Sequence, residues 1–174
     1  MKPAILVAGV GNVFFGDDGF GVEVARRLSA AGLPEGAVVA DFGIRGIHLA
    51  YELLAGYDSL ILVDAVPGDD EPGTLRVVEP RLDEDRRVSD PLVGSALADA
   101  HGMTPDAVLA LIGALGVRTG RILLVGCQPA DTSPGMELSE PVASAVPRAA
   151  ELVRELVEEQ LAASSAAGAE RSEP

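Results

Sequence analysis

Acidic side chains follow the apolar segments that the sequence predicts as strands. Asp17 and Asp18 come after the apolar run of residues 4–10, across a loop rich in glycine, and Asp64 stands inside the apolar run LILVDAV. A charge within an apolar run must be satisfied by hydrogen bonds, a cation or a metal, because burying a lone charge is costly. Asp64 is therefore the strongest single candidate for a functional role.

Other polar residues occupy similar positions. Asn12 follows the first predicted strand, Asp41 closes the second, and His101 precedes a predicted helix. In an open parallel sheet, ligands bind at the carboxyl ends of the strands. Two carboxylates and an imidazole there suit zinc or nickel, and three protein ligands leave coordination positions open, as in a catalytic or metal-sensing site.

Each candidate also has a structural interpretation. Asp17 and Asp18 precede a helix, where acids favour capping and the helix dipole. His101 could be a loop histidine that donates to a carbonyl group. We expect His48 to be structural and Cys127 to be a small buried residue rather than a nucleophile. Gln128 and Asp131 are expected to form a loop.

Several common motifs are incomplete or absent. Gly9 and Gly11 begin a dinucleotide fingerprint, but its third glycine would fall at Phe14. The sequence contains no phosphate-binding GxxxxGK[ST] loop and no G-x-S-x-G nucleophile elbow. A nicotinamide enzyme, a nucleoside phosphorylase relative and a serine hydrolase are therefore disfavoured.

The elements that must position these residues alternate along the first half of the chain. The pattern predicts strands at residues 4–10, 38–40 and 60–66, and helices from about residue 20 to Gly32 and at 47–54. Such β-α-β-α-β alternation implies an α/β fold with a mostly parallel sheet and right-handed crossovers.

The second half adds further elements. Residues 75–78 follow a Pro-Gly turn and are expected as an antiparallel edge strand, and residues 121–126 as another buried strand. Thr104 and Pro105 predict the start of a helix that runs to about residue 115. Ser139 precedes a long helix expected to end near Leu161. We therefore predict a single domain over residues 1–161 and a disordered tail over 162–174.

Composition limits the function further. The 174 residues are 48% hydrophobic but only 3% aromatic, so the core must be aliphatic. A formal net charge of −14 disfavours nucleic-acid binding and anionic membranes. One cysteine excludes an intrachain disulfide. The short apolar run after Lys2 is too brief for a signal peptide, and the expected location is the cytoplasm.

The order of these blocks resembles the hydrogenase maturation protease family. The blocks that carry the resemblance are Gly9-Val10-Gly11-Asn12 with Asp17-Asp18-Gly19-Phe20-Gly21, Asp41-Phe42-Gly43-Ile44-Arg45-Gly46, Val63-Asp64-Ala65, His101-Gly102, and Gly126-Cys127-Gln128-Pro129. The resemblance covers residues 4–158. It departs from the family at Asp18, where Glu is frequent, and at Ile44 and Arg45, which replace a pair that bears Thr.

The resemblance implies a three-layer α/β/α sandwich and a peptidase. Such a peptidase would remove a C-terminal extension from the large-subunit precursor of a nickel-iron hydrogenase after nickel insertion. It also implies metal recognition by Asp18, Asp64 and His101, and a role for Asp41 in catalysis or substrate binding. The nickel would come mainly with the precursor. A nonenzymatic nickel-binding or chaperone-like module of the same fold is the alternative.

Overall fold

The computed structural model of the protein describes residues 4–81, 91, 104–117 and 119–170. Within these residues a five-stranded sheet forms, in the order β2-β1-β3-β5-β4. Its strands are β1 (Ile5–Val10), β2 (Ala37–Gly43), β3 (Ser59–Ala65), β4 (Leu75–Val78) and β5 (Arg121–Cys127). All neighbours are parallel except β4, which is antiparallel to β5. The expected edge strand is thus confirmed.

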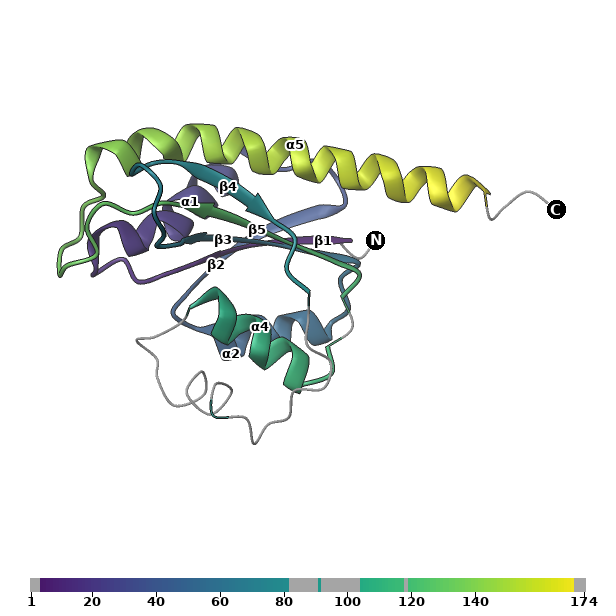
Figure 1. Ribbon diagram of the computed structural model, residues 1–174. Helices are drawn as coiled ribbons and strands as arrows, with labels where there is room; N and C mark the ends of the chain where they lie inside the picture. Colours follow the sequence, from purple (N-terminus) through teal and green to yellow (C-terminus); the bar gives the residue numbers. More distant parts are fainter. Residues whose placement is uncertain (1–3, 82–90, 92–103, 118, 171–174) are drawn as a thin grey trace.

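Helices cover both faces of this sheet. They are α1 (Phe20–Ala31), α2 (Gly46–Leu54), α4 (Pro105–Ala114) and α5 (Glu140–Glu170), with a short 3-10 helix η1 (Gly16–Gly19) before α1. Figure 1 shows α1 and α5 on one face and α2 and α4 on the other. The arrangement confirms the three-layer α/β/α sandwich.

The hydrophobic cores on the two faces of the sheet are built almost entirely from aliphatic side chains. Every residue of β1 and β3 is buried, because helices lie on both sides of these strands. Ile5, Val7 and Val63 face α1 and α5, whereas Leu6 and Leu62 face α2 and α4. This alternation assigns each strand residue to one face.

The strand order creates a topological switch point at the carboxyl edge of the sheet. From β1 the chain crosses to β2 on one side, and from β2 it returns past β1 to β3 on the other side. Right-handed crossovers in opposite directions place α1 and α2 on opposite faces. The connections that leave β1 and β3 therefore diverge, which is where ligands bind in such sheets.

Two predicted boundaries need correction. Asp41 does not follow its strand but lies within β2, which runs to Gly43. Helix α5 continues to Glu170, past the expected end at Leu161, so residues 162–170 are helical where disorder was expected. Alanine, the strongest helix former, dominates this segment and extends the helix, which projects beyond the sheet in Figure 1. Residues 171–174 lie outside the described part.

Among the helices that the structure describes, none combines the length and the apolar character needed to cross a bilayer.

Candidate functional site

Asp18 and Asp64 meet at the carboxyl edge of the sheet. Asp18 lies in η1, shortly after β1 ends, and Asp64 is the penultimate residue of β3. Their side chains are close enough for the charge of Asp18 to raise the pKa of Asp64. The structure therefore brings together two of the three predicted metal ligands.

Glycines allow the backbone to approach closely enough for this pairing. A methyl group on Gly21, in the first turn of α1, would lie 2.1 Å from the carbonyl oxygen of Val63 and 2.3 Å from that of Val10. Gly11 has a φ of 132° and a methyl group there would lie 1.9 Å from the carbonyl oxygen of Asp18. Only glycine fits either position, so the loop that carries Asp18 is held against β1 and β3.

Asp64 is a buried carboxyl with an unused oxygen. Its exposed fraction is 2%, and Oδ1 has no hydrogen-bond partner among the residues described. Burial raises its pKa well above the usual value, the charge of Asp18 raises it further, and the Ala65 amide opposes the shift. A buried acid that lacks a partner disfavours the ionised form until a cation arrives.

Asp18 is the more accessible member of the pair. Its Oδ2 accepts a 2.8 Å hydrogen bond from the backbone amide of Asn12. Burial nevertheless raises the pKa of Asp18, and that hydrogen bond only partly offsets the shift. Only for Asp64 does a neighbouring carboxylate contribute to the raised pKa, in agreement with the expectation that at least one of the clustered acids binds protons more readily.

Asp17 has a structural role that the sequence did not reveal. Its carboxylate accepts bonds of 2.8 and 2.9 Å from the amides of Ala130 and Asp131. It also accepts from the amide and hydroxyl of Ser139, at 2.7 and 2.8 Å. Burial would raise its pKa, but these hydrogen bonds outweigh burial and lower it. Asp17 is thus an anchor for the loop before α5 and not a free ligand.

Asp41 lies at the same edge of the sheet but on the other face. Val39, two residues earlier in β2, packs in the core under α1 and α5, whereas Asp64 alternates with residues of that core and so faces α2. The Asp41 side chain is 37% exposed, and its Oδ2 lies 4.0 Å from Nε of Arg26 on α1. A direct contact between Asp41 and Asp64 is therefore not part of this arrangement.

His101, the third predicted metal ligand, lies outside the described residues. The described residues contain no group of three or more His, Cys, Asp or Glu side chains that could hold a metal ion. The carboxylate pair alone offers hard oxygen donors and negative charge, which suit a divalent cation that brings other ligands of its own.

Cys127, Asp131 and Gln128 have structural environments, whereas no contact recorded among the described residues assigns a structural role to the His48 side chain. Cys127 is buried, and burial raises the pKa of its thiol to about 11, so the reactive thiolate is scarce at neutral pH. Asp131 accepts a 2.8 Å bond from the amide of Ser133 within its turn, and Gln128 donates to the Pro129 carbonyl. His48 is exposed on α2. These findings agree with the sequence interpretation of Cys127, Gln128 and Asp131.

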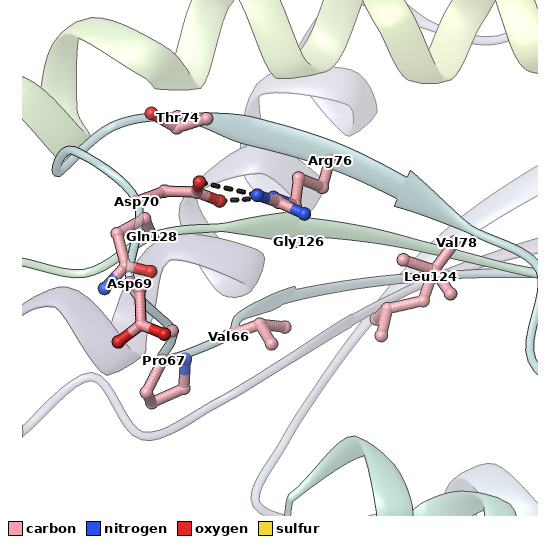
Figure 2. Close-up of a pocket in the computed structure, with 11 residues that line it drawn as sticks. Val66, Pro67, Asp69, Asp70, Thr74, Arg76, Val78, Leu124, Gly126 and Gln128 are labelled. Carbon is pink, nitrogen blue, oxygen red and sulfur yellow. Dashed lines mark hydrogen bonds and ion pairs between the residues drawn. The ribbon is translucent and has the colours of Figure 1, made fainter.

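A hollow of about 300 Å³ lies beyond the end of β3, between the loop after that strand, β4 and β5. Figure 2 shows Val66, Leu124 and Val78 along it, with the guanidinium of Arg76 bound by both oxygens of Asp70. The positive charge of Arg76 is therefore already paired with the Asp70 carboxylate. Neither Asp18 nor Asp64 lines this hollow, although it begins two residues after Asp64.

Comparison with known proteins shows the family to which the chain belongs. Residues 22–156 match the family model described as hydrogenase maturation protease. A putative hydrogenase maturation protease of Methanocaldococcus jannaschii is 36% identical over 87% of this chain and 95% of its own length. The hydrogenase expression/formation protein HupD of Rhizobium leguminosarum is 34% identical over 86% of this chain and 71% of its own.

Solved structures agree with the sequence matches. The hydrogenase 2 maturation peptidase of Thaumarchaeota archaeon SCGC_AB-539-E09 superposes with a TM-score of 0.64 at 35% identity, over 88% of this chain and 97% of that one. The hydrogenase maturating endopeptidase HybD of E. coli gives a TM-score of 0.67 at 26% identity, over 92% and 94%. The chain therefore belongs to the hydrogenase maturation protease family and is a peptidase of hydrogenase maturation.

Proposed function

We propose that this peptidase removes the C-terminal extension of a nickel-iron hydrogenase large-subunit precursor once nickel has been inserted. Asp18 and Asp64 would bind the nickel that the precursor carries, so that cleavage depends on a finished metal site. His101 completes the proposed ligand set on the strength of the family resemblance. The membership of the family supports the reaction class, and the carboxylate pair supports the recognition of a cation.

The observation that carries the proposal is that Oδ1 of Asp64 has no hydrogen-bond partner in the part of the chain that the structure describes. A buried carboxyl group without a partner destabilises a fold, so its presence beside a second carboxylate needs a compensating role. A metal ion supplied by the precursor would provide the missing partner. Because the raised pKa favours the protonated form of Asp64, the metal ion would compete with a proton for this carboxyl group.

The carboxylate pair and Asp41 also suggest how this peptidase would promote cleavage of the peptide bond. A metal held against the pair can polarise the scissile carbonyl or orient a water molecule. We assign Asp41 to proton transfer or to substrate binding at this edge. Because β1 lies between β2 and β3, a peptide that reaches both Asp41 and Asp64 must cross the end of β1.

The test is a cleavage assay with the full-length protein. Nickel-loaded and nickel-free large-subunit precursors are incubated with the wild type, Asp18→Asn and Asp64→Asn, and the precursor's C-terminus is followed by mass spectrometry. We expect a C-terminal peptide to be released only from the nickel-loaded precursor, by the wild type and by the control variant Asp58→Asn but not by Asp18→Asn or Asp64→Asn. Asp58→Asn is the matched control, because Asp58 is an exposed acid just before β3, at the opposite edge of the sheet.

Three outcomes would count against this proposal. Equal cleavage of the nickel-free precursor would remove the metal-dependent step. Tight binding of a cognate precursor without cleavage would favour the chaperone-like alternative. Loss of activity in Asp58→Asn as well would indicate that the substitutions act through general charge or stability and not through the pair.

A further inference from the structure

Three large apolar side chains stand exposed beside the carboxylate pair. Phe14 and Phe15 are 60% and 37% exposed, and Met136 is 74% exposed. The chain has four Phe and no Trp, so half of its Phe residues lie in this one loop. Clustered exposure of large apolar groups marks interaction surfaces in proteins. Phe14, Phe15 and Met136 are called the apolar patch below.

The patch is held in place by hydrogen bonds between two distant segments. Phe15 forms a bridge with Gly135, the Gly135 amide donates to the Phe14 carbonyl at 2.9 Å, and the Gly16 amide donates to the Gly135 carbonyl at 2.8 Å. The buried carboxylate of Asp17 ties the same segments together through Ala130, Asp131 and Ser139. The side chains are therefore presented on a rigid base, which lowers the entropic cost of binding a partner.

A hollow of about 260 Å³ adjoins the patch. Val13, Met136 and Leu138 give it apolar walls, and the carboxylates of Glu23 and Glu137 also line it. Glu23 is bound to Arg26 at 2.7 Å, which leaves Glu137 as the carboxylate without an ion pair among the described residues. An apolar side chain flanked by Lys or Arg would match this surface, and the net charge of −14 on the whole chain also favours a basic partner.

We propose that the apolar patch and this hollow are the docking surface for the hydrogenase precursor. The inference rests on the proposed function and adds the surface that positions the substrate. Its main argument is continuity: Phe15 is only three residues before Asp18, in the same loop between β1 and α1. A partner seated on the patch is thereby brought against the carboxylate pair. The partner surface is apolar and flanked by basic residues.

The test compares Phe14→Ser/Met136→Ser with the wild type in binding and cleavage of nickel-loaded precursor. We expect KM and the dissociation constant to rise by about tenfold or more, as when interface hot spots are truncated. The cleavage rate at saturating precursor stays near that of the wild type, because no ligand of the site is changed. Leu54→Ser is the control: Leu54 is 54% exposed at the end of α2, on the opposite edge of the sheet.

The outcomes separate this inference from the proposed function. If the double variant binds and cleaves like the wild type while Asp18→Asn is inactive, the docking surface is wrong and the peptidase proposal stands. If the wild type binds the precursor without cleaving it and the double variant loses binding, the docking surface stands and the proposed function fails. An equal loss of binding in Leu54→Ser would overturn the docking surface. Circular dichroism spectra and melting curves verify that each variant is folded.

Discussion

The charge of Asp18 acts on the buried carboxyl of Asp64, although 46 positions separate the two residues along the chain. Burial is the larger cause of the raised pKa of Asp64, and the neighbouring charge adds to it. The pair is therefore unfavourable in the free protein, and a cation relieves both causes at once. The effect of the pair on the free energy of unfolding, and the titration of Asp64, can be measured in the free protein without substrate.

Asp64→Asn should stabilise the free protein at neutral pH. The substitution removes a buried ionisable group, and we expect the free energy of unfolding to rise by about 1–3 kcal/mol. Because the folded-state pKa is raised, the wild type loses stability as pH rises from the unfolded value near 3.8 to the folded value. The gain in the variant should therefore be absent below pH 3.8 and grow above it. Urea unfolding across this range measures the effect, and a gain that does not change with pH would contradict it.

Asp18→Asn should lower the pKa of Asp64 without returning it to the ordinary range. The substitution removes the repulsive charge, but burial, which is the larger cause, remains. The titration of the Asp64 carboxyl by carbon-13 NMR or infrared difference spectroscopy measures this shift. Asp58→Asn is the control and should leave the Asp64 titration unchanged. An Asp64 pKa that stays the same in Asp18→Asn would mean that the two charges do not interact.

The proximity of Asp18 and Asp64 could be predicted from the sequence, because it follows from the order and direction of the strands. The apolar runs of β1 and β3 are long enough to identify, and parallel strands end at one edge, so Asp18 and Asp64 were expected to be neighbours. Strand alternation also determines the face on which Asp41 lies. That inference requires the strand to extend to Gly43, whereas the sequence predicted an end at residue 40.

Other features depend on contacts that local sequence does not encode. The partners of Asp17 lie 113 to 122 positions later in the chain, so capping was the natural interpretation of this residue. The small and polar residues after Leu161 predict disorder, whereas α5 continues through them to Glu170. The many alanines among them favour a helix even without packing.

Asp17→Asn should destabilise the fold and loosen the loop before α5. An amide cannot accept all the bonds that the carboxylate receives, so buried donors lose partners, and we expect a loss of at least about 2 kcal/mol at pH 7. The pKa of Asp17 is lowered, so its contribution is present above pH 3.8 and disappears as pH falls through the folded value. Wild type and variant should therefore converge in stability at low pH. Unfolding curves at pH 7 and pH 3 measure this, and equal stability at pH 7 would contradict it.

Asp41→Asn should slow cleavage while leaving the fold intact. A general base typically contributes about 100-fold to 10,000-fold to a rate, and the side chain is partly exposed with no buried partner to lose. Single-turnover cleavage of nickel-loaded precursor measures the rate. Glu35→Gln, a change to another acid away from this edge, is the control. A rise in KM alone would assign Asp41 to substrate binding, and an unchanged rate and KM would exclude both roles.

The end of α5 after Leu161 should be dispensable for stability and cleavage, whereas the helical turn that contains Gln160 and Leu161 should be needed for stability. Residues 162–166 are exposed, whereas Gln160 is buried against Ser59 and Leu161 packs on the core beside Gly36. Deletion of residues 162–174 should change the free energy of unfolding by less than about 0.5 kcal/mol and leave precursor cleavage intact. Deletion of residues 160–174 removes both contacts and should cost about 2 kcal/mol or more. Melting temperatures of the two truncations measure the difference. Equal melting temperatures would show that the core does not depend on Gln160 and Leu161, and a large loss in the shorter deletion would show that the projecting helix packs on another surface.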